Sequence, residues 1–301
     1  MADDLKKILA MNPDLTIDEL NVVAEQRVIE SNNRPVDEFC GLSPAQMYNW
    51  LYGQFDDLQG VTINTPADLS ASPVMRYLSL ILDEAVANGG AFKATSKGNL
   101  PAKLVKQASD LLPEFAVSQF NTPVMISNYA GSNEDKFDAL HYTRILSNIT
   151  DIAKLRGGRY QVKKSVITRY QNEGCHAFYL PMLEAAIYRY NWAYLDHWEY
   201  DVDLRLFWLF LLWRIQSHGS IDQLMIEAAT AFPDALSQLP GNQYNSSTEL
   251  LDTLIEYRFI RRFLEFWGFV TVNPLRRVDG QPVPRVADIQ PLLTQTFIFD
   301  R

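Results

Sequence analysis

The chain has 301 residues, of which 47% are hydrophobic and 21% charged, a composition typical of globular proteins. A domain usually takes about 100–200 residues, so the chain accommodates one large core or two to three smaller ones. The formal net charge is −9, which argues against a protein that coats nucleic acid over its whole surface.

The cysteines and the N-terminal segment bear on the compartment. Cys40 and Cys175 fit no metal-binding or redox spacing, and two free thiols are favoured over the alternative of a disulfide. The segment MADDLKKILAMNPDL lacks the basic start and apolar core of a signal peptide. No stretch reaches the roughly 20 apolar residues of a membrane span. We therefore expect a cytoplasmic protein with no membrane partner.

Residues 1–58 are predicted to form an acidic helical arm. The first 60 residues contain eleven acidic and four basic side chains, so much of the negative charge lies there. Thr16 and Glu19 have capping-box spacing, and apolar residues follow at helical intervals. A second short helix is expected to begin in the motif GLSPAQM, where Ser43 can cap and Pro44 suits the first helical position. We interpret this motif as structural punctuation, with a binding loop as the alternative.

Residues 72–172 are predicted to hold two winged-helix-like units. The stretch GGAFKATSK begins at Gly89, and the similar stretch GGRYQVKKS begins at Gly157, 68 residues later. Each stretch follows one helical pattern and precedes another, and a supersecondary unit that recurs would produce this order. The four helical patterns are residues 73–87, 101–112, 133–153 and 165–171.

Residues 173–245 are predicted to form an aromatic-rich helical core. Pro181 is expected to start one of its helices, and the segment DLRLFWLFLLWRI, residues 203–215, is its centre. Every residue from Leu206 to Trp213 is apolar, and a helix that is apolar on all sides must be covered on all sides. Asp203 is placed as the N-cap of this central buried helix.

Residues 246–301 are predicted to form a C-terminal winged-helix-like unit. Ser246 and Glu249 have capping-box spacing before a long helical pattern, and Gly268 is placed as its C-cap. Alternating segments then flank the hairpin signal Asp279-Gly280. The predicted fold is mainly α with short β-hairpins: tandem winged-helix-like units around an aromatic-rich helical core.

Motifs that would carry catalysis are missing from the sequence. It contains no glycine-rich phosphate loop and no nucleophile elbow. Cys175 and His176 are adjacent, so on a regular element they point apart and make a poor catalytic dyad. The segment 196–203, with Asp196 and Asp203 at its ends, is interpreted as a solvated acidic loop, the alternative being a divalent-cation site. We expect no cofactor, no metal and no enzymatic activity.

Basic residues are concentrated in three stretches, residues 91–107, 152–172 and 258–277, which hold 15 of the 27 lysines and arginines. Winged helices bind DNA with a recognition helix in the major groove and basic wing residues on phosphates. The residues expected to contact nucleic acid on this hypothesis are Lys93, Lys97, Lys103, Arg156, Arg159, Lys163, Lys164, Arg276 and Arg277.

Two functions are compatible with these observations. A non-enzymatic protein-interaction protein, acting as an adaptor or regulator with an unidentified protein partner, is favoured by the acidic arm and by the missing catalytic motifs. DNA binding by the basic winged-helix units is the alternative, so nucleic acid is a possible partner.

Four stretches resemble a family of uncharacterised bacterial proteins that carry an N-terminal GLSPxQM motif and a later KGNLP motif. They are NNRPVDEFCGLSPAQMYNWLY (32–52), ATSKGNLPAKLVKQ (94–107), LRGGRYQVKKS (155–165) and YNWAYLDHW (190–198). The resemblance covers most of the chain and implies a bacterial, cytoplasmic origin. The family has no established activity, so the resemblance implies no functional residues.

Overall fold

A computed structural model of the chain describes residues 11, 16–118, 129–196, 198, 200, 202–273, 277–278 and 281–300. Helices predominate in these ranges, and the strands form small antiparallel sheets of two or three strands. The mainly helical fold class with short β-elements is therefore confirmed. In the described part of the chain, no helix combines the length and the apolar character that a bilayer crossing requires.

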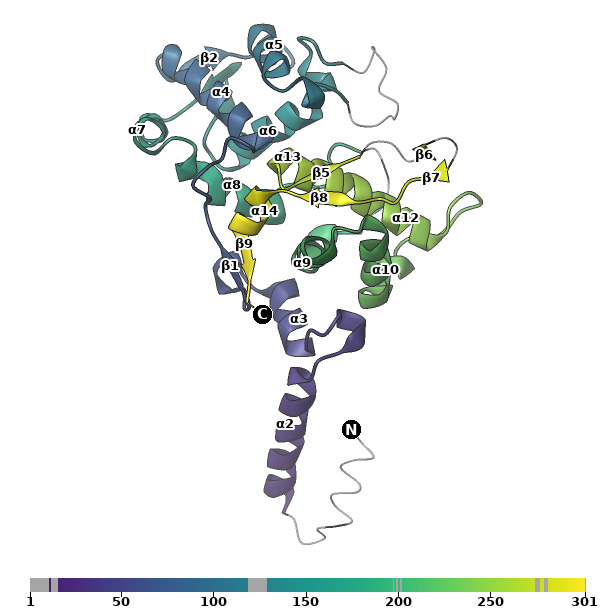
Figure 1. Cartoon of the computed structure of the whole chain (residues 1–301). Helices are drawn as coiled ribbons and strands as arrows, with labels where there is room; N and C mark the ends of the chain where they lie inside the picture. Colours follow the sequence, from purple (N-terminus) through teal and green to yellow (C-terminus); the bar gives the residue numbers. More distant parts are fainter. Residues whose placement is uncertain are drawn as a thin grey trace.

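Of the arm predicted over residues 1–58, the helix α2 (Ile17–Asn33) extends away from the body of the molecule and has no buried side chain (Figure 1). We keep the name arm for this helix. The expected capping box is present, because Thr16 accepts a hydrogen bond from the Glu19 N–H and the Glu19 carboxylate accepts one from the Thr16 N–H. The 3₁₀ turn η1 (Asp37–Phe39) and the helix α3 (Pro44–Tyr52) then join the arm to the body.

The segment after the arm is tied to the C-terminal part of the chain. After the 3₁₀ turn η2 (Phe55–Asp57), strand β1 (Val61–Ile63) pairs antiparallel with β9 (Phe297–Phe299). The ring of Trp50 in α3 contacts the rings of Trp213 and Phe299, with centroids 5.4 and 5.7 Å away. The stretch between the predicted arm and the first predicted unit therefore contributes a strand to the body.

One three-stranded sheet takes strands from both units that the sequence predicts in residues 72–172. Its order is β2-β4-β3, and Phe92 lies directly opposite Tyr160, so the two Gly-Gly stretches pair with each other. The two stretches therefore belong to one unit, which corrects the expectation of two. Its elements are α4 (Pro73–Ala87), β2 (Ala91–Lys93), α5 (Ala102–Leu111), η3 (Pro113–Phe115), η5 (Glu134–Lys136), α6 (Asp138–Ile149), β3 (Lys154–Arg156), β4 (Arg159–Gln161) and α7 (Lys164–Glu173).

The aromatic-rich helices form the centre of the molecule. Helix α8 (His176–Tyr188) begins five residues before Pro181, because Ala177, Phe178 and Tyr179 are buried and continue the helix on its N-terminal side. The segment expected as one central helix is a 3₁₀ turn, η6 (Leu204–Phe207), followed by α9 (Trp208–His218). Asp203 caps this segment as expected, since its side chain accepts a hydrogen bond from the Arg205 N–H.

The C-terminal segment consists of several helices followed by short strands. The elements after α9 are α10 (Ile221–Ala231), α11 (Pro233–Ser237), α12 (Ser247–Leu254), the π-helix η7 (Ile255–Leu264), α13 (Glu265–Trp267), β5 (Val270–Val272), β6 (Arg277–Val278), β7 (Gln281–Pro282), β8 (Ala287–Ile289) and α14 (Pro291–Thr296). Strand β5 pairs with β8, and β6 pairs with β7. Ser220, two residues after the end of α9, forms an antiparallel β-bridge with Val286, which directly precedes β8. In the first unit, strand β2 follows α4 and pairs with β4.

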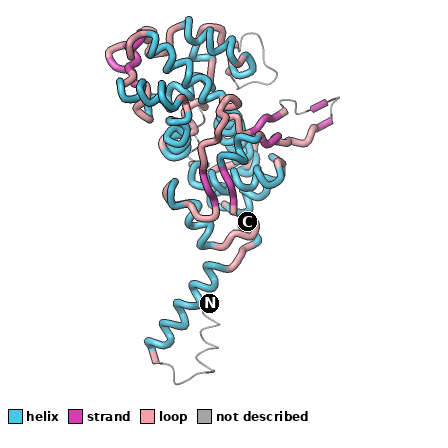
Figure 2. Tube along the Cα trace, turned by 60° about the vertical axis from the view of Figure 1, so that its left-hand side comes forward, coloured by secondary structure: helices cyan, strands magenta, loops and turns pink. Residues whose placement is uncertain are grey.

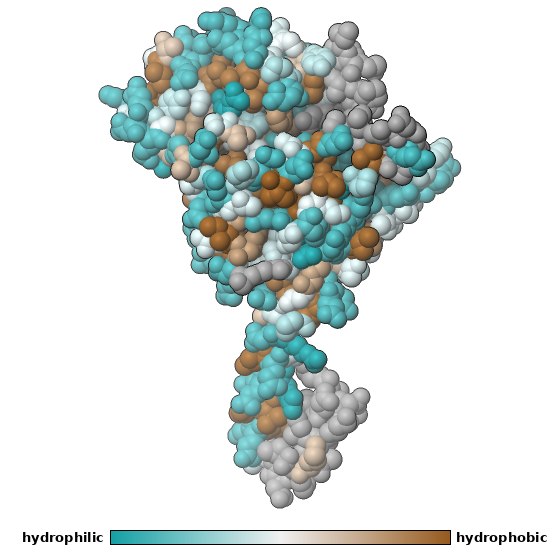
Figure 3. Space-filling model, viewed as in Figure 1, coloured by the Kyte–Doolittle hydropathy of each residue, from teal (hydrophilic) through white to brown (hydrophobic). Residues whose placement is uncertain are grey.

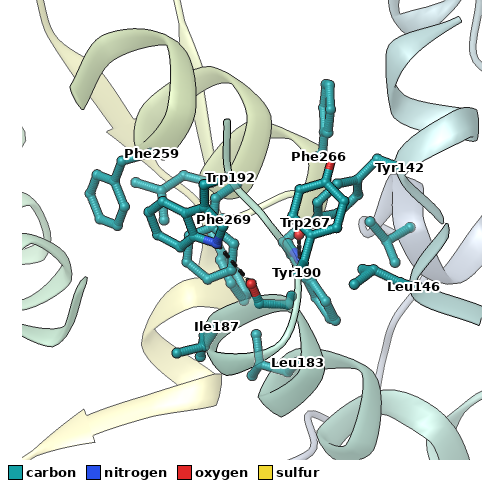
Figure 4. Packing of buried hydrophobic residues seen from close by; sticks show 14 of the residues in the cluster. Tyr142, Leu146, Leu183, Ile187, Tyr190, Trp192, Phe259, Phe266, Trp267 and Phe269 are labelled. Carbon is teal, nitrogen blue, oxygen red and sulfur yellow. Dashed lines mark hydrogen bonds between the residues drawn. The ribbon is translucent and has the colours of Figure 1, made fainter. Parts of the chain in front are cut away.

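A single hydrophobic core runs through both segments. In Figure 4, Tyr142 of α6 lies beside Trp267 of α13, and the Trp267 indole N–H donates a hydrogen bond of 3.1 Å to the Tyr142 hydroxyl. The ring of Tyr190 contacts Tyr142 with centroids 4.7 Å apart. The central helix α9 is covered as predicted, with Trp208 only 1% exposed. Helix α6 of the first unit is thus packed against α13 of the C-terminal segment.

Candidate nucleic-acid interface

The three-stranded sheet has one buried and one exposed face. Phe92 and Tyr160, opposite each other on neighbouring strands, are buried and stacked with centroids 5.3 Å apart. Side chains alternate along a strand, so the adjacent row points the other way. That row consists of Lys93, Arg159 and Arg156, one residue from each strand in direct register, and all three are exposed. We call these three residues the cation row.

The cation row carries an electrostatic cost. Like charges directly opposite each other in a sheet destabilise it. Among the described residues, none of the three cations forms an ion pair with a carboxylate, and the hydrogen bond of 2.9 Å from Arg159 Nη2 goes to the neutral Ala91 carbonyl. A row of this kind attracts an anion from solution, because no described carboxylate of the chain neutralises it.

A two-residue turn places the cation row at the tip of a hairpin. Gly157 and Gly158 join β3 to β4, and their φ angles of 54° and 71° are both positive. Two positive φ angles are typical of a type I′ turn, which glycine adopts without strain. A Cβ on either glycine would meet nothing within 4 Å, so the tip is open to solvent. The sequence Arg-Gly-Gly-Arg therefore forms a protruding β-ribbon with an arginine on each strand.

A buried carboxylate holds the loop between β2 and α5. Glu134 accepts hydrogen bonds from the Leu100 N–H, from Arg144 Nε and from His141 Nδ1 at 2.5, 2.5 and 2.8 Å. Burial raises the pKa of Glu134, but the hydrogen bond from His141 and the charge of Arg144 outweigh it, so the pKa lies below its usual value. The Tyr160 hydroxyl donates a hydrogen bond to the carbonyl of Gly98 in the same loop. The KGNLP motif is thereby fixed beneath the sheet.

The other predicted contacts of the first unit are all exposed, but they lie on other elements than the cation row. Lys163 and Lys164 are exposed at the start of α7, directly after β4, and the first turn of α7 contains no acidic residue. Lys103 is exposed on α5. Lys97 is exposed as well, but its Nζ lies 3.5 Å from the Asp135 carboxylate, which neutralises part of its charge.

The third basic stretch contributes no described side chain to this surface. Arg258 and Arg262 are buried, each 3% exposed, and both bind Asp196: Arg258 through two hydrogen bonds of 2.9 and 3.1 Å, Arg262 through one of 3.1 Å. Asp196 is therefore a buried counterion, which corrects its assignment to a solvated loop. Arg276 and the Arg277 side chain lie outside the described residues, as do His197, Glu199 and Asp201.

The helix α6 presents little surface to a ligand. Leu140, Tyr142, Thr143, Leu146 and Ser147 are all buried in it, and it packs on α4 and α8. In the helix–turn–helix family a recognition helix needs an open face to enter the major groove. α6 follows two helices and precedes a hairpin, as such a helix does, yet its face is covered by the body of the molecule.

The cysteine and histidine that are adjacent in the sequence do not form a reactive pair. The Cys175 thiol lies 3.0 Å from the Ser79 hydroxyl, and burial raises the pKa of Cys175 to about 11. His176 Nε2 lies 2.8 Å from the Ala67 carbonyl oxygen instead. Within the described ranges, no group of three or more histidine, cysteine or acidic side chains is placed to hold a metal ion.

Sequence reasoning did not place Lys93 in the same row as Arg156 and Arg159, because it assigned them to different units. The signal was present in the two Gly-Gly stretches, whose aromatic residues Phe92 and Tyr160 are cross-strand partners. A scan against protein-family models found no match, and neither did searches of the curated proteins and of the solved structures.

Proposed function

We propose that the chain binds duplex DNA through the exposed face of its three-stranded sheet. The observation that carries this proposal is the cation row, in which Lys93, Arg159 and Arg156 stand in register with no described carboxylate beside them. Phosphate groups are regularly spaced anions, and lysine and arginine bind them in most protein–DNA complexes. Lys163 and Lys164 extend the positive surface beyond the end of β4.

The order of elements supports a winged-helix-like unit as the carrier of this surface. The order helix, strand, helix, helix, strand, strand, with the first strand beside the last, is that of a winged helix, and residues 73–161 follow it. Residues 208–289 follow it too, with the Ser220 bridge in place of the first strand. On this proposal the chain contains two such units instead of the three that its sequence suggests.

The proposed contact uses the β-ribbon and not the third helix. Helix α6 is buried, whereas the tip at Gly157 and Gly158 is open. The major groove of B-DNA is wide enough to admit a two-stranded β-ribbon. Arg156 and Arg159 flank the tip, so they reach phosphates on the two sides of a groove or a base edge within it.

The test is the affinity for a mixed-sequence duplex of 20 base pairs, measured by fluorescence anisotropy between 50 and 200 mM salt. Each cation that neutralises a phosphate adds about 0.9 to the slope of log K against log salt. The variant Arg156→Ala/Arg159→Ala is expected to lower the slope by about 2 and to weaken binding at 50 mM salt.

The matched control is Lys106→Ala/Arg169→Ala, which removes the same charge from exposed positions that already pair with Asp110 and Glu173. This variant is expected to keep at least most of the wild-type slope. The proposal is refuted if the wild-type chain fails to bind at 50 mM salt. It is also refuted if the two double variants have the same slope, because the charge would then act without regard to position.

The acidic arm favours a second function, protein interaction. None of the side chains of α2 is buried, although Ile17, Val22 and Ile29 are apolar and more than half exposed. A solitary helix of this length is marginally stable in water, so most of its stability has to come from packing against a partner. This proposal predicts that α2 gains protection from hydrogen exchange when its partner is bound.

A further inference from the structure

The arm and the cation row lie at opposite ends of the molecule. Figures 1 and 2, which differ by a rotation of 60°, both place α2 at one end and the strands of the three-stranded sheet at the other. Among the described elements, the main contact of α2 is with α3. The arm of one molecule therefore cannot cover the cation row of that same molecule.

One face of α2 alternates acidic and aliphatic side chains. Asp18, Val22, Glu25 and Ile29 follow at intervals of four, three and four residues, which places them on one side of a helix. All four are exposed, Val22 by 53% and Ile29 by 60%. Figure 3 shows apolar residues between hydrophilic ones along the arm. Such a face is suited to a partner surface that is basic and has aliphatic portions.

Pairing of two arms with each other is opposed by charge. Within residues 17–33 the four acidic side chains outnumber the single basic one, Arg27, so each helix carries a net charge of −3. Like charges that face each other across a helix pair destabilise it and select a different partner. The arm therefore needs a basic surface, and the cation row is such a surface on the same chain.

The spacing of charges on the two surfaces agrees. Asp18 and Glu25 are seven residues apart, which is about 10.5 Å along a helix that rises 1.5 Å per residue. Lys93 and Arg156 lie on the two outer strands of the sheet, two strand spacings or about 9.6 Å apart. A helix laid across the strands would place one carboxylate over each outer cation. Val22, which lies between the two carboxylates, would then rest on the aliphatic stem of Arg159 on the central strand.

We propose that α2 of one copy of this chain binds the cation row of a second copy. The contact joins an acidic helix face to a basic sheet face and uses Asp18 and Glu25 against Lys93 and Arg156. This contact does not require DNA binding, and only one consequence of it rests on the proposed function. Where the cation row also binds DNA, the arm of a second copy and the phosphate backbone compete for it.

The contact is tested by sedimentation velocity of the full chain, free of nucleic acid, at 50 and 500 mM salt. The wild-type chain is expected to associate at 50 mM salt and to sediment as a monomer at 500 mM, because exposed ion pairs are screened. Glu25→Lys is expected to leave the chain monomeric at 50 mM salt. The matched control is Glu30→Lys, which makes the same charge change on the other side of α2 and is expected to leave association intact.

A charge exchange gives the decisive result. Lys93→Glu chains are expected to be monomeric alone, as are Glu25→Lys chains, whereas an equimolar mixture of the two is expected to associate again. A wild-type chain that is monomeric at 50 mM salt overturns the proposal. So does a Glu30→Lys variant as impaired as Glu25→Lys, or a mixture that fails to recover.

The two proposals fail separately. Self-association is measured without nucleic acid, so that result does not depend on whether the chain binds DNA. Loss of DNA affinity in Arg156→Ala/Arg159→Ala likewise does not depend on whether the chain self-associates. Where both hold, Glu25→Lys is expected to bind DNA more tightly than the wild-type chain at 50 mM salt. An unchanged affinity in that variant would refute the competition.

Discussion

Glu265 is the residue at which pH should have the clearest effect on stability. It begins α13, its side chain is 13% exposed, and its Oε2 accepts no hydrogen bond from a described residue. Burial raises the pKa of Glu265 to about 7, although the Arg261 guanidinium 3.7 Å away and the hydrogen bond from the Val272 N–H act in the opposite direction. In the unfolded chain its pKa is expected near 4.5.

The sign of the effect follows from these two values. The folded chain holds the proton of Glu265 more tightly than the unfolded chain, so folding is favoured at low pH and stability falls as pH rises from 4.5 to 7. Above pH 7 Glu265 is charged in the folded and in the unfolded chain, so the folded chain then bears the full cost of burying a charged carboxylate. The interval between the two pKa values corresponds to about 3 kcal/mol.

The perturbation is Glu265→Gln, which keeps the shape and removes the charge. The variant is expected to be more stable than the wild-type chain by up to about 3 kcal/mol at pH 8, and to differ little from it at pH 4.5. Urea unfolding at both pH values measures the free energy of unfolding. The exposed Glu38→Gln serves as a control and should change little at either pH. A Glu265→Gln variant that is destabilised equally at both pH values would refute the reasoning, since it would mean that the charged form is the stabilising one.

Three further substitutions test the packing by urea unfolding. Trp208→Ala removes a ring that is 1% exposed and should cost about 3–5 kcal/mol, whereas a loss below about 1 kcal/mol would mean that the central helix is open to solvent. Gly268→Ala adds a Cβ at φ +76° and 2.2 Å from the Ala71 carbonyl oxygen, so a cost of about 2–5 kcal/mol is expected, and a neutral result would contradict this close approach. Asp196→Ala removes the carboxylate that binds both Arg258 and Arg262 in the interior and should cost about 3–5 kcal/mol, while an unchanged midpoint would show that the two arginines do not depend on it.

Local signals in the sequence predicted local structure well. The capping boxes at Thr16, Ser43 and Ser246 are all present, because each depends on two residues three positions apart. The burial of the central helix also followed from its composition, since no polar face was available to meet water. The 3₁₀ turn at its start was not predicted, because it depends on how Leu204 and Phe207 are packed.

Features that depend on distant parts of the chain were not predicted. Arg258 and Arg262 read as surface cations in the sequence, but both are buried and bind Asp196, a carboxylate more than 60 residues away. The π-helix Ile255–Leu264 was not predicted, because its apolar residues fit the periodicity of an α-helix almost as well as that of a π-helix. Lys93, Arg156 and Arg159 were each predicted as candidate site residues. Their arrangement in one row was not predicted, because it depends on the pairing between β2 and β4.

The pairing of β1 with β9 has a consequence for biosynthesis. Ile63 meets Phe297, so the strand that follows the arm waits for a partner made about 230 residues later. At about 5–20 residues per second this interval lasts roughly 10–50 s. During this time Trp50 and Val61, buried in the finished protein, have no β9 to cover them. A nascent chain of this protein should therefore bind chaperones through its first 60 to 70 residues until translation has passed residue 299.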